Sequence, residues 1–279
     1  MRVVESVLDL RAILDNYNTN KVIGFVPTMG ALHNGHCSLI RAAKQKCDVV
    51  VTSIFVNPTQ FNDKTDLEKY PRTLNEDLAK LEKEGCDVVF VPSVEEIYPD
   101  NSSLSLDLEG LDKVMEGEFR PGHFDGVVEV VNRLFNIVKP NFAFFGEKDF
   151  QQLSIIRFMV KKLNHDIQII GCPILREEDG LAMSSRNTLL TEEHRSVSPV
   201  IFKALTNAKN NIGKFAVEDI KKELVAQIED NGLLKVEYVD IVNSATLKSL
   251  SNWIDEPMNI CVAVFAGKVR LIDNLKLNY

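Results

Sequence analysis

The stretch GFVPTMGALHNGHCSLIRAA, residues 24–43, changes character twice along its length. Residues 22–28 are apolar and β-branched, which predicts a short buried strand. From His36 onward apolar residues recur at helical spacing. Residues 29–35 therefore form a strand-to-helix turn, and in an open parallel sheet such a turn lies at the carboxyl ends of the strands, where ligands bind.

The composition limits the class of protein. A chain of 279 residues, 45% hydrophobic and 26% charged, suits a globular protein of two domains. No stretch approaches the roughly 18 apolar residues of a membrane span, and the N-terminus lacks a signal-peptide core, so we expect a cytoplasmic protein. Five cysteines without a Cys-x-x-Cys pair argue against a structural zinc site or disulfides. The net charge of -8 argues against a nucleic-acid-binding surface.

Strand and helix signals alternate along the first two-thirds of the chain. Short Val-, Ile- and Phe-rich segments are separated by helical stretches, and the segments are KVIGFVPT, DVVVTSIFVN, DVVFVP, FAFFGE and IQIIGCP. This alternation predicts an α/β fold, a Rossmann-like parallel sheet with helices on both faces. After about Pro173 two helices and a group of strands predict a smaller C-terminal α+β domain. We place the domains at residues 1–172 and 173–279.

The first polar cluster is the pair His33 and His36. A helix N-terminus offers backbone N–H groups and partial positive charge to a phosphate, and Gly30 and Gly35 permit close approach of a ligand. Two imidazoles could add hydrogen bonds to phosphate oxygens. The alternatives are that one histidine caps the helix while the other is a surface residue, or that a metal site lies beside Cys37.

Three further clusters follow strand-like segments. SIFVNPTQF ends in neutral groups for a small polar substrate, FGEKDFQQL contains Lys148, and GLAMSSRN offers two hydroxyls and the Arg186 guanidinium. The alternatives are an ordinary turn, helix capping by Asp149 and a solvated loop. Neither serine lies in a Gly-x-Ser-x-Gly elbow, which disfavours a serine nucleophile. Because parallel strands bring their turns to one edge, the four clusters together indicate a pocket for a polyphosphate and a small polar acid.

Seven motifs, in order over nearly the whole chain, match one family: PTMGALHNGH, SIFVNPTQF, YPRTLNEDLAKL, RPGHFDGV, FGEKDFQQL, GLAMSSRN and RLIDN. The sequence resembles the pantothenate synthetases, the pantoate–β-alanine ligases of coenzyme A biosynthesis. The combination is highly specific, whereas the His-x-Gly-His turn alone is shared with class I aminoacyl-tRNA synthetases and other nucleotidyltransferases. One departure is Asn34, where the family usually carries an acidic residue.

The resemblance implies an enzyme that forms pantoyl adenylate from (R)-pantoate and ATP, releases diphosphate, and lets β-alanine displace AMP. It implies that His36 is the catalytic histidine and that Gln60 and Gln152 hold pantoate, with Gln60 also bordering the β-alanine site. The positions that it implies for ATP binding are Met29, Gly30, Ala31, Leu32, His33, Asn34, Gly35, His36, Gly146, Glu147, Lys148, Asp149, Leu175, Met183, Ser184, Ser185 and Arg186.

The resemblance also implies a homodimer and a C-terminal domain, 173–279, that acts as a lid over ATP. A magnesium ion would be bound mainly by the phosphates, so we expect no dedicated protein site for a metal. We expect no nucleic-acid or membrane partner. The alternative function within the same class is a cofactor nucleotidyltransferase that stops at nucleotide transfer. A nucleotide-binding protein without enzymatic activity is the alternative from another class.

Overall fold

The computed structural model describes residues 1–17, 21–61, 64–100 and 103–277. The chain forms two compact units, of which the first contains 1–112, 117–147 and 152–173, and the second 113–116, 148–151 and 174–279. The domain limits expected from the sequence, 1–172 and 173–279, remain a prediction.

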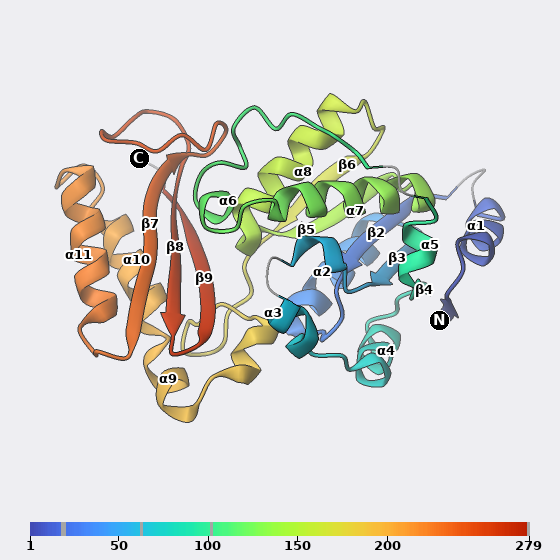
Figure 1. Ribbon diagram of the computed structural model, residues 1–279, viewed down its shortest axis with the longest axis horizontal. Coiled ribbons are helices and arrows are strands. Elements are labelled where there is room, and N and C mark those ends of the chain that lie inside the picture. The colour runs from blue at the N-terminus through green and yellow to red at the C-terminus, as the bar shows by residue number, and fades with distance from the viewer. Residues whose placement is uncertain (18–20, 62–63, 101–102, 278–279) are drawn as a thin grey trace. The chain divides into compact units, whose positions relative to one another are not determined.

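The first unit is built on a parallel sheet whose six strands, within the described residues, have the order β1-β4-β3-β2-β5-β6 (Figure 1). The strands are β1 (Arg2–Val4), β2 (Ile23–Thr28), β3 (Val49–Ile54), β4 (Val88–Phe90), β5 (Phe142–Gly146) and β6 (Gln168–Cys172). The α-helices that connect them are α1 (Val7–Asp15), α2 (Asn34–Lys46), α3 (Lys64–Lys69), α4 (Leu74–Lys83), α5 (Val94–Ile97), α6 (Glu116–Phe119), α7 (His123–Val138) and α8 (Phe150–Lys162).

Side chains of these strands alternate between two hydrophobic cores, one on each face of the sheet. Phe25 and Val51 belong to a core shared with α1, α7 and α8. The neighbouring residues Val26 and Val50 belong to a core shared with α2 and α4. Both faces of the strands are therefore buried, which explains their continuous apolar sequences and confirms the predicted α/β sheet with helices on both faces.

Two local details differ from the sequence analysis. The sequence does not predict strand β1, because it has only three residues, of which two are exposed, and these show no periodicity; it forms by pairing with β4. Helix α2 begins at Asn34 rather than at His36, because His33 is its N-cap.

The second unit contains an antiparallel sheet in the order β7-β8-β9, in agreement with the predicted C-terminal group of strands. Leu181 packs against one side of this sheet together with the apolar faces of α10 (Val200–Asn210) and α11 (Val217–Glu229). The elements are η3 (Ser185–Leu189), α9 (Glu192–Val197), α10 (Val200–Asn210), α11 (Val217–Glu229), β7 (Leu234–Asn243), β8 (Met258–Ala266) and β9 (Val269–Leu277).

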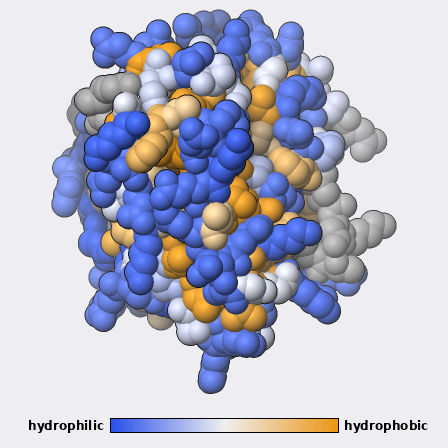
Figure 2. Space-filling model, turned by 90° about the vertical axis from the view of Figure 1, so that its left-hand side faces the viewer, coloured by the Kyte–Doolittle hydropathy of each residue, from blue (hydrophilic) through white to orange (hydrophobic). Residues whose placement is uncertain are grey.

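Helix α11 is amphipathic, and it buries Val217, Ile220 and Leu224 in this core. Figure 2 shows the face of the molecule on which α11 lies, where hydrophilic side chains predominate and hydrophobic ones appear in small groups between them. That distribution is ordinary for a protein surface.

Candidate functional site

Three of the predicted polar turns follow neighbouring strands of the first unit's sheet. β2 pairs in parallel with β3 on one side and with β5 on the other. The chain continues from β2 to β3 and β4 in one direction, whereas β5 and β6 lie on the opposite side of β2 (Figure 1). The order of strands thus reverses at β2, and the crevice beyond the carboxyl ends of such strands is the usual ligand site of an open α/β sheet.

The turn after β2 is closed by its own two histidines. His33 is the N-cap of α2, and its Nδ1 accepts a hydrogen bond from the backbone N–H of Gly35 at 3.1 Å. His36 reaches back, and its Nδ1 accepts from the N–H of His33 at 3.3 Å. Since Nδ1 is the acceptor in both neutral rings, the ring proton is on Nε2. Capping therefore leaves each histidine in the tautomer that can donate a hydrogen bond through Nε2.

Asp77 of α4, which is not among the residues predicted for the site, holds the same turn through hydrogen bonds. Asp77 is 1% exposed, and its carboxylate accepts from the backbone N–H of Ala31 at 2.9 Å and of Leu32 at 2.7 Å. Lys80, one turn further along α4, donates to the Leu32 carbonyl at 2.8 Å. These bonds stabilise a backbone with positive φ at Gly30 and Ala31. The sequence around Asp77 resembles a family motif but does not predict this contact, because a contact over 46 residues has no local signature.

The turn after β3 brings Gln60 to the first turn. It continues as η1 (Pro58–Gln60), and the Gln60 Nε2 lies 3.1 Å from the sulfur of Met29. Asn57, 1% exposed, holds the other end of this amide by donating to the Gln60 Oε1 at 3.2 Å. The backbone of Gln60 is also contacted, since His123 Nδ1 lies 2.8 Å from its carbonyl oxygen. The structure thus joins two of the predicted segments within one unit.

Tight packing supports η1 from the side of α7. Asn57 also donates to the carbonyl of Gly126 at 3.1 Å. A Cβ atom at Gly126 would lie 2.6 Å from the Thr59 carbonyl oxygen, so only glycine lets the helix approach η1 this closely.

The turn after β5 carries the remaining predicted residues of this edge. Gly146 ends the strand, and Glu147 begins η2 (Glu147–Asp149), which leads directly into α8. Gln152 lies half-buried in the first turn of α8 and belongs to the first unit, as do Gly146 and Glu147. Lys148 and Asp149 belong to the second unit. Helix capping by Asp149, the alternative raised above, remains a prediction.

In the second unit, Leu175 and Met183 lie side by side. The Met183 N–H donates to the Leu175 carbonyl at 3.0 Å, and Arg176 and Ala182 form an isolated antiparallel bridge. Residues 175–183 are therefore a hairpin, and η3 follows it with Ser184 as N-cap. The fourth cluster does not end a strand of the parallel sheet, which corrects the expectation that all four clusters do so. It is also anchored rather than solvated, since Leu181 is 4% exposed.

Ser184, Ser185 and Arg186 are arranged by the start of η3. The Ser184 hydroxyl accepts from the Arg186 N–H at 3.3 Å, and all three residues are half-buried. Lys148 and Ser184 line one small cavity of the second unit, together with Asp273. Two of the predicted ATP-binding segments therefore meet there.

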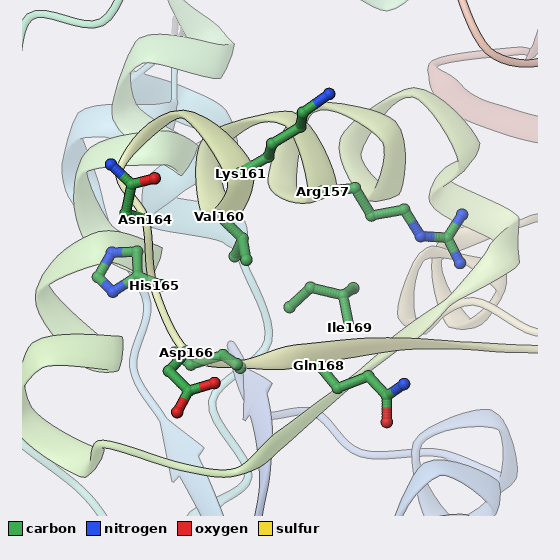
Figure 3. A pocket seen from close by; sticks show the side chains of 9 residues that line it. Arg157, Val160, Lys161, Asn164, His165, Asp166, Gln168 and Ile169 are labelled. Atoms are coloured by element: carbon green, nitrogen blue, oxygen red, sulfur yellow. The ribbon is translucent and has the colours of Figure 1, made fainter.

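A larger cavity, of about 550 Å³, lies between α8 and the start of β6 (Figure 3). It is at the amino end of β6, whereas the predicted turns follow the carboxyl ends of the strands. Figure 3 shows the Lys161 ammonium pointing up from α8 and the Arg157 guanidinium pointing to the right, while Val160 and Ile169 lie in the space between α8 and β6. This divergence gives the cavity no convergent set of charges for a ligand, so we do not assign it to the reaction.

Among the residues that the structure describes, there is no group of three or more His, Cys, Asp or Glu side chains arranged to hold a metal ion. Within the same residues, no helix combines the length and the apolar sequence that a membrane span requires.

The fold and the capped His-x-Gly-His turn define an α/β protein with a candidate nucleotide site at the carboxyl edge of its parallel sheet. The family model described as Pantoate-beta-alanine ligase matches residues 2–276. The chain belongs to the pantoate-beta-alanine ligase family. It is therefore an enzyme, a ligase of pantothenate biosynthesis that joins pantoate to β-alanine.

Relatives match over the full length of the chain. The pantothenate synthetase of Phocaeicola vulgatus is 50% identical over 99% of both chains, and that of Bacteroides thetaiotaomicron is 48% identical over 99% of both. The crystal structure of pantothenate synthetase from Thermus thermophilus superposes with a TM-score of 0.93 at 41% identity over 100% of both chains. A pantoate-beta-alanine ligase from Francisella tularensis, whose structure is described as complexed with beta-gamma ATP and beta-alanine, has a TM-score of 0.83 at 37% identity, covering 99% of this chain and 97% of that one.

Proposed function

We propose that the ligation proceeds in two steps through pantoyl adenylate. A carboxylate oxygen of (R)-pantoate attacks the α-phosphorus of ATP, and the bond to diphosphate breaks. The amine of β-alanine then attacks the acyl carbon, loses a proton, and displaces AMP. The observation that carries this proposal is the pair of histidine caps beside Gln60 at the carboxyl edge of β2. The Francisella tularensis relative, described with an ATP compound and β-alanine, supports the choice of both substrates.

His36 is the catalytic histidine in this proposal. Negative charge builds on the phosphate oxygens as the carboxylate attacks, and preorganised donors stabilise that charge most effectively. The His36 ring is fixed by its bond to the His33 N–H, which directs the donor capacity to Nε2. The N-terminus of α2 adds a partial positive charge, and we assign residues 29–36 to ATP on these grounds.

Gln60 and Gln152 are assigned to pantoate, and Gln60 also borders β-alanine. An amide can accept from the hydroxyls of pantoate and donate to its carboxylate. Gln60 is held at both ends of its amide, by Asn57 and by the Met29 sulfur, so it is oriented before substrate arrives. Orientation of this kind lowers the entropic cost of aligning the reacting groups.

The remaining ATP-binding residues are Gly146, Glu147, Lys148, Asp149, Leu175, Met183, Ser184, Ser185 and Arg186. Lys148 supplies a compact positive charge, and the Arg186 guanidinium supplies a planar fork for phosphate oxygens. Residues 173–279 act as the lid domain in this proposal. Lys148 and Ser184 line the same small cavity, so these two segments lie close together, which supports assigning them to one substrate.

Magnesium is proposed as the partner of ATP, and it would neutralise charge on the phosphates. The described residues offer no cluster of metal-binding side chains, so phosphate oxygens and water would supply most of its ligands. We also propose a cytoplasmic homodimer on the precedent of the family.

The test is AMP formation by the purified protein. We expect diphosphate from ATP and pantoate alone, and AMP with an equal amount of pantothenate only when β-alanine is also present. Diphosphate release that requires neither pantoate nor β-alanine, with the nucleotide transferred to another acceptor, would instead favour a nucleotidyltransferase. Binding of ATP without any product would favour a nucleotide-binding protein that has no enzymatic activity.

A further inference from the structure

Two adjacent residues of β9 contact both ATP-binding segments of the second unit. β9 is an edge strand, and Asp273 and Asn274 are each 5% exposed. Asp273 pairs with Val262, a residue of the core beneath the helices, whereas Asn274 pairs with Cys261. Because successive side chains of a strand point to opposite faces, the two residues can each hold a different segment at this edge.

Asp273 holds the hairpin 175–183. Its carboxylate accepts two hydrogen bonds from the Arg176 guanidinium, at 2.6 and 2.9 Å. Arg176 also donates to the Gly180 carbonyl at 3.1 Å, and it lies 3.8 Å from the centroid of the Phe202 ring. This fork fixes the hairpin between Leu175 and Met183, the two ATP-binding positions that it carries.

Asn274 holds the other segment. Its Nδ2 donates to the backbone carbonyl of Lys148 at 2.9 Å. Its Oδ1 accepts from the Asn259 Nδ2 at 3.3 Å, and the Asn259 Oδ1 accepts from the Ser244 hydroxyl at 2.8 Å. Each step of this chain of bonds sets the orientation of the next amide, so the Asn274 Nδ2 is directed at Lys148.

The two segments meet at the cavity that Lys148, Ser184 and Asp273 line. We propose that Asp273 and Asn274 are positioning residues for ATP. They touch no reacting atom. Asn274 positions Lys148, and Asp273 positions the hairpin and, through it, Ser184. The inference rests on the proposed ATP-binding roles of these segments.

The test is a double-mutant cycle of Asn274→Ala and Lys148→Ala, read as separate KM values for ATP and pantoate. Loss of a buried hydrogen bond that holds a ligand-binding segment predicts that Asn274→Ala raises the KM for ATP about tenfold. The KM for pantoate should change less than about twofold, because Gln60 and Gln152 remain in place. The double variant should be no more than about twofold worse than Lys148→Ala alone, since residues that act through each other are not additive.

Two further variants serve as controls. Lys276→Ala, an exposed position of the same strand, is the matched control and should keep both KM values. Asn274→Ser retains a polar group but is too short to reach Lys148, and it replaces Asn274→Ala if that variant does not fold. A wild-type KM for ATP in folded Asn274 variants, or a double variant whose defects multiply, would overturn the inference. If Lys148→Ala itself leaves the KM for ATP unchanged, the proposed role of Lys148 fails, and this result is distinguishable from the first two.

Discussion

The His33–His36 turn and the hairpin 175–183 differ in how the protein holds them. The first is closed by caps between residues two and three positions apart, and Asp77 reinforces it from α4. The second depends on Arg176, which is paired with a carboxylate 97 residues further along the chain. Short-range caps form as soon as the helix forms, whereas a buried ion pair exists only after the whole unit has folded. The hairpin should therefore be the more vulnerable of the two to a single substitution.

The largest effect is expected for Arg176→Ala. Asp273 is 4% exposed in its side chain, and removal of its partner leaves a buried charge uncompensated, a change that typically costs about 3–5 kcal/mol. The single tryptophan, Trp253, lies in the second unit, so its fluorescence in a urea titration measures this loss directly.

Arg195→Ala is the matched control, because it breaks the exposed pair with Asp179 in the same region. Exposed pairs contribute only about 0–1 kcal/mol, so the tryptophan transition should barely move. Equal shifts for the two variants would mean that the Arg176 fork does not hold the hairpin.

The next effect is on the rate of the first step and separates the two roles of His36. We expect His36→Asn to keep an acceptor near the position of Nδ1, and thus the cap, but to lose the donor at Nε2. Removing one preorganised donor typically lowers the rate by about 10²–10³-fold. Diphosphate release with ATP and pantoate is the measurement.

His36→Gln provides the comparison, since its amide can place a donor near the position of Nε2 while the cap is weakened. It should retain more activity than His36→Asn. The opposite order would show that His36 matters for capping rather than for stabilising the phosphate.

A smaller effect is expected for Asp77→Asn, a substitution in the residue of α4 that reinforces the His33–His36 turn. The substitution removes a charged acceptor and turns an amide donor toward the N–H of Ala31 or Leu32, which should cost about 1–3 kcal/mol. Circular dichroism during urea unfolding should show the loss, while the Trp253 transition stays close to that of the wild type. A shift seen only by Trp253 would contradict the assignment of this clamp to the first unit.

The smallest effect is expected for Cys37→Ala, one residue after His36. Burial raises the pKa of the Cys37 thiol, so the neutral form persists in the folded protein to a higher pH than in the unfolded chain. We expect activity within about twofold of the wild type, because a buried neutral thiol contributes no nucleophile. In the native protein, modification by a thiol reagent should remain slow at pH 8 and accelerate in urea. Rapid loss of native activity on modification of Cys37 would favour the alternative of a metal site beside Cys37.

The sequence predicted much of the first unit because its signals are local. Continuous apolar segments identified β2 to β6, and the junction at residues 29–35 was recognised from a change of periodicity. The structure shows the same junction with α2 starting two residues earlier, at Asn34, since the side chain of His33 satisfies an N–H of the first helical turn. The sequence did not predict strand β1, because its three residues form a strand only by pairing with β4.

The α/β class, the family and the residues expected to bind ATP and pantoate can all be predicted from the sequence, since motifs and periodicity are properties of neighbouring residues. The contacts that hold those residues in place are visible only in the folded protein. Asp77 contacts Ala31, Asn57 contacts Gly126, and Arg176 contacts Asp273 over 46, 69 and 97 residues of sequence, and each contact forms because packing of the cores brings the partners together. A buried polar group must find a partner wherever the fold provides one, and no local pattern along the chain states which partner that will be.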